Sequence, residues 1–392
     1  MNESAKTLIM LGGVLLLGFL TDGIGRRTRL PRVTLLLLFG VAIGPSGFDL
    51  LAELPESWFS NISSMALVMV GFLLGGKLTL PSLRKHGGLV IWISVAVVAV
   101  TAFVTLIGLL AIGAPLALAA LLGAIATATA PAAAADVVQE MKATGRFSRT
   151  LLGVVAVDDA WGLVLFSVAL SFAHTLGGSS GLGALRAGAW EIGGAVVVGV
   201  ALGIPMAYLT GRIRPGEPTL AEALGAVFLC GGLAMWFGVS FLLAAMVLGA
   251  MVANLAAHHG RPFHAIEGID WPFMILFFVF AGASLEPEAL LQLGTLGTAY
   301  VVLRVIGRLL GGWMGGTLAH APPVLRRWMG AALMPQAGVA VGMALVAVER
   351  FPEFGPRILS VVIASTVLFE IFGPMMTRKA LIAAGEAATT RP

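Results

Sequence analysis

The sequence has few charged residues. Only 11% of the 392 residues are charged and 58% are hydrophobic, whereas roughly 25% of a soluble protein is charged. This balance excludes a soluble enzyme, a disordered chain and a nucleic-acid-binding domain. The single cysteine, Cys230, excludes a disulfide framework and a cysteine-rich metal site. Two tyrosines and eight tryptophans leave little aromatic surface for stacking nucleotides.

Polar stretches long enough to form a soluble domain are also lacking, and apolar runs fill the chain. A membrane-spanning helix needs about 20 predominantly apolar residues. The sequence therefore predicts an all-α polytopic membrane protein with about thirteen transmembrane helices. The N-terminal run is expected to be an uncleaved first span, because arginines follow it rather than a small-residue cleavage site. The expected spans are roughly 6–24, 31–47, 58–76, 88–111, 115–139, 147–172, 188–210, 219–237, 240–257, 271–285, 290–318, 327–348 and 357–382.

The distribution of lysine and arginine predicts the orientation. Most of the 24 basic residues lie in segments that share one side of the membrane if the N-terminus is outside. Acidic turns such as 49–56 fall on the other side. Because basic residues concentrate on the cytoplasmic side, we expect the N-terminus outside and the C-terminus in the cytoplasm. The net charge of +4 is then a topology signal with the lipid bilayer as partner, not a surface for nucleic acid.

Two of the expected spans contain a proline near their middle. Pro131 follows Thr127 and Thr129, and Pro335 lies in a similarly small-residue segment. Proline removes a backbone hydrogen bond, and in lipid such a break is tolerated only inside protein or beside a cavity. The breaks are seven spans apart, and an odd offset reverses the direction of the chain. We therefore expect an inverted repeat with two crossed broken helices at a binding site; two ordinary proline kinks are the alternative.

Two adjacent aspartates, Asp158 and Asp159, lie near the middle of the sixth expected span. A charge at the bilayer centre costs at least roughly 2.5–3.5 kcal/mol. Burial raises the pKa of a carboxylate and a bound cation lowers it again, which suits a site that exchanges protons for a hard cation. We expect Asp159 and Asp158 to form that site, with oxygens of Thr127 and Thr129 as further ligands. The alternative is a structural salt bridge. Asp136 is expected to complement the dipole of the half-helix after the first break.

The eleventh expected span carries two arginines. Arg304 and Arg308 share one face with Gly311 and Gly315, and such a face meets protein rather than lipid. We expect each arginine to pair with a carboxylate, although snorkelling to an interface is the alternative. Glu370 in the last span is the candidate partner of Arg304, in a structural ion pair.

Together these residues resemble the monovalent cation/proton antiporter superfamily, in its double-aspartate branch, over nearly the whole chain. The paired aspartates after a proline-broken helix are the specific part of the resemblance, and the glycine-rich pieces are weak by themselves. The matching segments are Leu30–Arg32, Gly40–Pro45, Thr129–Pro131, Asp158–Asp159, Phe277–Gly282, Arg304–Arg308, Met334–Gln336 and the final span.

The resemblance implies a moving core and a scaffold that forms a homodimer. The core would comprise spans within about 88–172 and 290–382, the scaffold spans within about 6–76 and 219–285, and the linker would be the span at about 188–210. It also implies roles for individual residues. Asp159 would be the carboxylate shared by cation and proton, Asp158 its neighbour paired to a basic group, and Thr129 the threonine at the break.

Three positions depart from the pattern of that family. Ala130 stands where serine or aspartate is frequent, Gly338 where glutamate is common, and Arg308 where the electrogenic branch usually has lysine. Arginine there is typical of electroneutral relatives, whereas the double aspartate is typical of electrogenic ones. One and two protons per cation therefore both remain open.

The leading hypothesis is a secondary antiporter, not an enzyme, that needs no cofactor. It would exchange Na⁺, K⁺ or Li⁺ for H⁺ by alternating access in the inner (plasma) membrane of a bacterium. One alternative is a sodium-coupled symporter of an organic anion on a related fold, which requires a polar cavity that the Ala/Gly/Val-rich core does not predict. An intramembrane aspartyl protease requires two aspartates from separate helices, and here they are adjacent.

Overall fold

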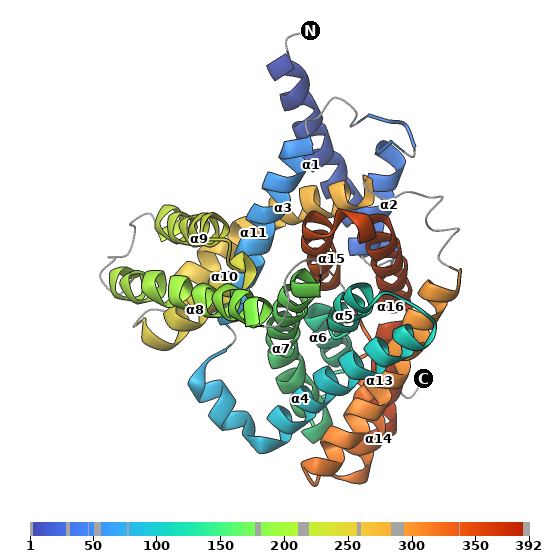
Figure 1. The fold of residues 1–392 in the computed structure, drawn as a ribbon. Coiled ribbons are helices and arrows are strands. Elements are labelled where there is room, and N and C mark those ends of the chain that lie inside the picture. The colour runs from blue at the N-terminus through green and yellow to red at the C-terminus, as the bar shows by residue number, and fades with distance from the viewer. Residues whose placement is uncertain are drawn as a thin grey trace. The chain divides into compact units, whose positions relative to one another are not determined.

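The chain is helical throughout its described part (Figure 1). The structure, a computed structural model, describes residues 3–28, 32–45, 47–50, 56–76, 78–176, 182–210, 219–256, 260–283, 294–336 and 338–386. These residues contain no strand. The α-helices are α1 (Glu3–Thr28), α2 (Arg32–Ile43), α3 (Glu56–Gly76), α4 (Leu80–Ala111), α5 (Leu116–Ile125), α6 (Pro131–Glu140), α7 (Arg146–Leu176), α8 (Leu182–Thr210), α9 (Thr219–Trp236), α10 (Phe241–Leu255), α11 (Gly260–Ala283), α13 (Gly294–Leu318), α14 (Pro323–Ala332), α15 (Gly338–Arg350) and α16 (Gly355–Ala383).

Each expected span coincides with a helix. The two spans that were expected to be broken each consist of two short helices. The fifth span consists of α5 and α6, and the twelfth consists of α14 and α15. Among the described residues, α4, α7, α8, α13 and α16 are long and apolar enough to cross a membrane by themselves, and α11 is so when its two bent halves are taken together. Shorter apolar stretches lie in α1, α2, α3, α5, α9 and α10. The predicted all-α architecture is confirmed.

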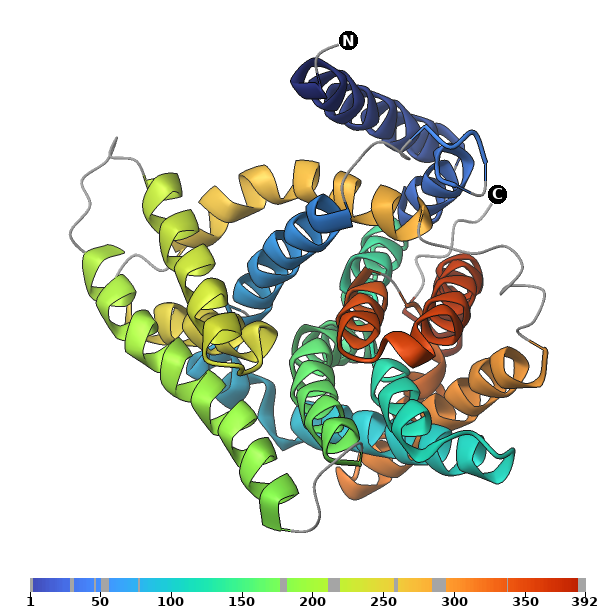
Figure 2. The same cartoon turned by 45° about the horizontal axis from the view of Figure 1, so that its top comes forward.

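The helices form two compact units, each built from two separate stretches of chain. Unit 1 comprises residues 1–79 and 186–287, and unit 2 comprises residues 80–185 and 288–392. Within unit 1, α10 packs on α3, and α11 packs on both α2 and α3; Figure 2 shows α11 in gold beside α3 in blue.

Unit 2 contains the same succession of elements twice. A long helix, a broken pair and a second long helix occur first as α4, α5–α6 and α7, and again as α13, α14–α15 and α16. The long helix α13 packs along α4, while α5 packs on α7 and both α14 and α15 pack on α16. This repetition is the pattern expected from two breaks at matching positions.

Glycines bring the backbones of α13 and α4 close together. A Cβ on Gly307 would lie 2.7 Å from the Thr101 Cα, and one on Gly311 would lie 2.7 Å from the Val97 Cα. Small residues allow neighbouring helices in a membrane to pack at such short separations. The prediction that this glycine face of the eleventh span meets protein is confirmed.

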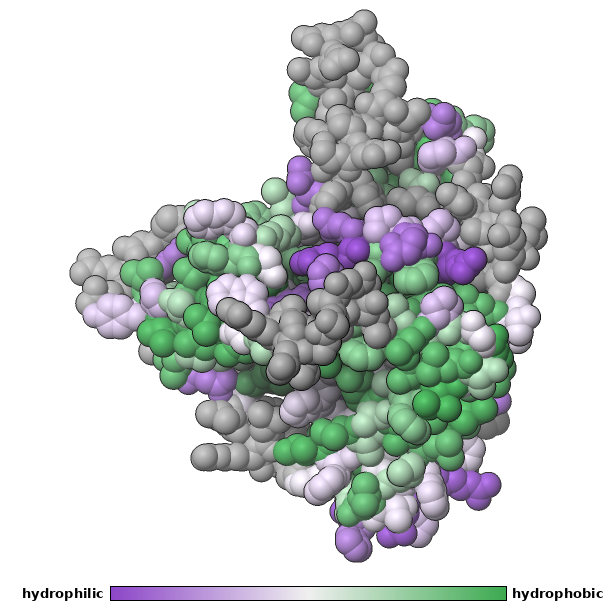
Figure 3. Space-filling view, in the orientation of Figure 1, coloured by the Kyte–Doolittle hydropathy of each residue, from purple (hydrophilic) through white to green (hydrophobic). Residues whose placement is uncertain are grey.

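The opposite face of α13 is apolar and exposed. Arg304 and Arg308 are 0% exposed, whereas Ile306 is 41% and Trp313 is 55% exposed. In Figure 3 the surface of unit 2 over α13 and α5 is mostly hydrophobic, with hydrophilic residues near α14 below it. Charge inside and apolar side chains outside is the reverse of a soluble fold and suits a helix in contact with lipid.

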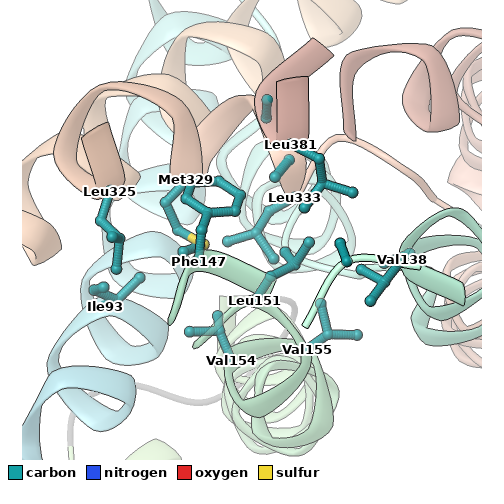
Figure 4. Close-up of a cluster of buried hydrophobic side chains, with 14 of the residues drawn as sticks. Ile93, Val138, Phe147, Leu151, Val154, Val155, Leu325, Met329, Leu333 and Leu381 are labelled. Atoms are coloured by element: carbon teal, nitrogen blue, oxygen red, sulfur yellow. The ribbon is translucent and has the colours of Figure 1, made fainter. Parts of the chain in front are cut away.

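The first half of α7 lies in a hydrophobic cluster (Figure 4). It contributes the buried side chains of Phe147, Leu151, Val154 and Val155. Their partners come from α4, α6, α14 and α16, and include Ile93, Val138, Met329, Leu333 and Leu381. Apolar packing on several sides fixes the position of this part of α7, and therefore also that of the next turn, which carries the two aspartates.

The start of α7 is capped by a carboxylate from the far end of the chain. The N–H groups of Phe147 and Ser148 donate to Glu386 Oε1 and Oε2 over 2.6 and 2.9 Å. A Cβ on Gly145 would lie 2.1 Å from Glu386 Oε1, so a larger residue there would displace the carboxylate. Partial burial raises the pKa of Glu386, but the hydrogen bonds from Ser148 and Phe147 lower it by more, so this pKa lies below its usual value. The anion thus sits at the positive end of the α7 dipole.

Candidate ion-binding site

The two breaks of unit 2 contact each other. After α5 ends at Ile125, the chain stays non-helical until Pro131 begins α6. The N–H of Ala130 donates to the carbonyl oxygen of Pro335 over 3.0 Å. Proline is favoured at the first position of a helix because its missing N–H has no intrahelical partner there. Each proline therefore starts or precedes a half-helix, and the non-helical segments between half-helices meet at one point.

Both aspartates face the first break. Asp158 and Asp159 are buried, with exposures of 0% and 1%. The N–H of Thr129 donates to Asp159 Oδ1 over 3.3 Å, and the Thr129 hydroxyl donates to Asp158 Oδ2. Adjacent residues on a helix point about 100° apart, yet both reach the same threonine because it offers one donor from the backbone and one from the side chain.

Arg308 forms a buried salt bridge with Asp158. Its Nη1 donates to Asp158 Oδ2 over 2.8 Å, and both side chains are fully buried. Its Nη2 donates to the Ala128 carbonyl over 2.9 Å and to the Thr127 carbonyl. The guanidinium therefore neutralises Asp158 and also donates to two carbonyls of the non-helical segment between α5 and α6.

Arg304 joins the two breaks. It donates to the carbonyls of Ala126 and Ala128 at the first break, over 3.1 and 2.9 Å. At the second break it donates to the Met334 carbonyl over 3.0 Å. Its guanidinium also lies 4.1 Å from the centre of the Phe369 ring. Snorkelling is wrong for both arginines, because neither side chain reaches the surface of the described structure.

Glu370 is placed near this junction by the α16 helix. It is 6% exposed and follows Phe369, the residue whose ring contacts Arg304. Gly373, almost one turn further on, packs against Pro335, where a Cβ would lie 2.5 Å from the Pro335 Cα. The pairing of Glu370 with Arg304 stays a prediction.

Two sequence-based expectations change at the first break. The Thr127 hydroxyl donates to the Ala124 carbonyl over 2.6 Å, and its own carbonyl accepts from Arg308. Its oxygens therefore serve contacts within the protein in this structure. The expected role of Asp136 is wrong, because no acidic residue lies in the first turn of α6 and Asp136 is exposed. A helix dipole acts mainly on its first turn.

Sequence reasoning gave no role to three further polar side chains that are buried. Tyr300, Gln336 and Thr366 are each 0% exposed. A signal was available for Gln336, which immediately follows the second proline. Tyr300 could have been found from spacing, since it lies one turn before Arg304 on the same face of α13.

The donors available to an ion at the crossing are oxygens. Within the described residues, no three His, Cys, Asp or Glu side chains gather as a metal site. Carboxylate and carbonyl oxygens are the ligands that hard cations prefer. The arrangement can neutralise one aspartate permanently and offer the other to a proton or a small cation.

Known proteins are similar to this chain in sequence and in fold. Residues 13–382 match the family described as sodium/hydrogen exchanger, transmembrane. The chain is 24% identical over 344 residues to the ammonium/H⁺ antiporter subunit AmhT of Alkalihalophilus pseudofirmus, which covers 86% of this chain and 83% of that protein.

The fold is similar to two solved structures of the sodium proton antiporter MjNhaP1 from Methanocaldococcus jannaschii. Each shares 19% sequence identity with this chain, and the match covers 98% of this chain and 99% of the other. The TM-score is 0.77 for the structure at pH 8 and 0.72 for that from electron microscopy. This likeness confirms the polytopic all-α membrane fold predicted from the sequence.

Proposed function

The chain belongs to the sodium/hydrogen exchanger family and is a cation/proton antiporter, and from this premise we propose that it exchanges Na⁺ for H⁺ by alternating access with Asp159 as the shared site. The observation that carries the proposal is that the two aspartates have different hydrogen-bond partners. Asp158 is held by a guanidinium and a hydroxyl. Asp159 accepts the backbone N–H at the start of a half-helix.

The environment of each aspartate favours a different role. The Arg308 guanidinium neutralises the charge of Asp158 through their salt bridge, because arginine does not lose its proton in proteins. Asp159 is buried beside backbone dipoles, where a proton or a cation can each compensate its charge. Thr129 connects the two carboxylates and lies at the break, where an oxygen from its segment would complete the coordination of a cation.

Alternating access would follow from the two units. Unit 2 carries both breaks and would be the moving core. Unit 1 would be the scaffold of a homodimer, and it includes the span at about 188–210 that the sequence predicts as the linker. The core would expose Asp159 to one side of the membrane at a time. We place the protein in the inner (plasma) membrane of a bacterium, with its N-terminus outside and its C-terminus in the cytoplasm.

The cation is open to a second candidate. The similar protein from Alkalihalophilus pseudofirmus is an ammonium/H⁺ antiporter subunit by name. NH₄⁺, K⁺ and Li⁺ therefore belong beside Na⁺ in any assay. Antiport is favoured over symport with an organic anion, since both relatives named above are antiporters.

The decisive variant is Asp159→Asn. It retains the shape of the side chain but removes its charge and its titration, so cation-dependent proton flux in proteoliposomes should be lost. Asp136→Asn, the same change at an exposed site of unit 2, is the matched control and should retain full flux. Radiolabelled methylammonium serves as the ammonium probe, because free NH₃ crosses bilayers unaided. Robust exchange by folded Asp159→Asn protein would refute the site.

Competition between cation and proton provides a second arm. If both bind Asp159, acidification should raise the apparent KM of the cation without greatly changing the maximal rate. A KM that does not change with pH would indicate separate sites for the two ions.

A further inference from the structure

Gln336 is a buried amide that the proposed exchange does not use. It follows Pro335 at the second break and is 0% exposed. Neither its Nε2 nor its Oε1 has a hydrogen-bond partner among the described residues. A buried polar atom without a partner loses the hydrogen bond that it had with water. Such groups in folded proteins are generally satisfied by ordered water or by a ligand.

Two further buried hydroxyl groups also lack a hydrogen-bond partner among the described residues. Tyr300, on α13, lies beside the side chains of Gln336 and Ser365. Its hydroxyl nevertheless makes no well-formed hydrogen bond within the described structure. The Thr366 hydroxyl on α16 is fully buried and also lacks a partner in the described part of the chain.

Gln336 lies at the second break, Tyr300 lies beside Gln336, and Thr366 lies on the face of α16 that packs against the break. Thr366, Gly373 and Thr377 are seven and four residues apart and therefore share one face of α16. This face lies on the break, because Gly373 contacts Pro335 and the Thr377 hydroxyl donates to the Ala332 carbonyl over 2.9 Å. The three polar side chains thus come from α13, from α16 and from the segment between α14 and α15.

The chemistry of this group identifies its ligand as water. The Gln336 amide presents a donor and an acceptor, and a cation would satisfy only the acceptor. Each hydroxyl can donate or accept. Water does both and needs two to four polar partners in a buried site. The three side chains carry no charge that would select an ion, although Glu370 lies one turn beyond Thr366 on the same face.

The group is adjacent to the proposed transport site. The N–H of Thr129 donates to Asp159, and the next N–H, of Ala130, donates to the carbonyl of Pro335, the residue before Gln336. Two successive backbone amides therefore connect the carboxylate to this group. A cation that leaves a carboxylate needs replacement oxygen ligands, and water at this position supplies them.

We propose that Gln336, Tyr300 and Thr366 hold internal water beside the crossing, and that this water hydrates the cation as it leaves Asp159. The hydrating role depends on the antiport function proposed above, whereas the presence of the water does not. The two parts are therefore tested separately.

The presence of water is tested by hydroxyl-radical footprinting of the whole protein in detergent, with X-ray radiolysis of water as the source. Tyr300 is 0% exposed, yet it should be oxidised if water lies against its ring. Phe277, which is 1% exposed in unit 1, is the dry control. Gln336→Met retains the length of the side chain without its polar atoms and should reduce oxidation of Tyr300 to the Phe277 level. Equal oxidation of Tyr300 and Phe277 in the wild-type protein would overturn the proposal.

The role of the water is tested by transport in proteoliposomes. Loss of one hydrogen-bonding group from the exit step should lower the turnover of Gln336→Met roughly tenfold. Gln139→Met makes the same change at an exposed site of unit 2 and should retain the wild-type rate. Normal turnover in a Gln336→Met protein that has lost Tyr300 oxidation would overturn the hydrating role. If the wild-type protein transports no cation but still shows Tyr300 oxidation, the proposed antiport fails and the water site stands.

Discussion

The salt bridge between Arg308 and Asp158 permits a quantitative test of how this core is stabilised. Arg308→Ala removes the only guanidinium that contacts Asp158 in the hydrogen bonds described above. It leaves a charged carboxylate in a fully buried position, and it also takes a donor from the carbonyls of Thr127 and Ala128. Breaking a buried pair from one side costs about 3–5 kcal/mol. The lost carbonyl contacts add roughly 1 kcal/mol each.

The double variant separates these contributions. Asp158→Asn in the Arg308→Ala background removes the uncompensated charge but restores neither carbonyl contact. Stability should therefore recover in part, by roughly 1–3 kcal/mol. Asp158→Asn by itself should cost less than Arg308→Ala, because Arg308 retains its carbonyl acceptors. Arg308→Lys, which retains the charge but not the planar fork, should fall between the wild type and Arg308→Ala.

The assay is SDS-induced unfolding of the purified protein in detergent, monitored by tryptophan fluorescence and repeated for all members of the cycle. The reasoning fails if Asp158→Asn restores no stability to Arg308→Ala. In that case Arg308 acts mainly through the backbone carbonyls, and the charge of Asp158 is compensated from elsewhere.

Three further predictions concern the charge moved in each exchange, the cap of α7 by Glu386 and the contact of Gly311 with α4. Because the salt bridge to Arg308 occupies Asp158 and leaves Asp159 as the exchanging carboxylate, exchange should be electroneutral; cation uptake driven in proteoliposomes by a membrane potential without a pH gradient would refute this. Glu386 has a lowered pKa in the folded state, so its contribution to stability should be complete above its unfolded pKa and should be lost as the pH falls through the folded value. Glu386→Gln should lower the melting temperature near neutral pH and flatten this acid-side decline, and an unchanged acid profile would exclude Glu386 as its cause. Gly311→Ala should destabilise by about 1–3 kcal/mol through contact with α4, whereas Gly232→Ala, which has open space at its Cβ, should be neutral or stabilising in the same SDS assay.

The sequence was most informative where the free-energy cost of a residue in a membrane restricts where that residue can occur. Apolar runs of spanning length, proline in mid-span and charge in mid-membrane are each too costly to occur without a structural reason. The thirteen spans, the two breaks and the burial of Arg304 and Arg308 therefore followed from composition and spacing. The aspartates were conspicuous for the same reason, since two adjacent carboxylates in an apolar run require compensation.

Partners were less predictable than positions. Both arginines were expected to meet carboxylates, yet most of their described hydrogen bonds go to backbone carbonyls at the breaks. Every residue has a carbonyl, so the sequence carries no mark of which ones a break will leave unpaired. Gln336 and Tyr300 were given no role because a neutral polar residue costs much less in a membrane than a charged one. Whether such a residue has a hydrogen-bond partner depends on tertiary packing.

The hydrogen bonds of Glu386 connect the C-terminal part of the described chain to α7, the helix that carries Asp158 and Asp159. These hydrogen bonds lie about three helical turns before Asp158. The first half of α7, between them and Asp158, packs in the hydrophobic cluster. A tag, tether or soluble module joined just after residue 386 would therefore lie next to the hydrogen bonds between Glu386 and the start of α7. A mechanical load on residue 386 would thus act on the start of the helix that carries both aspartates.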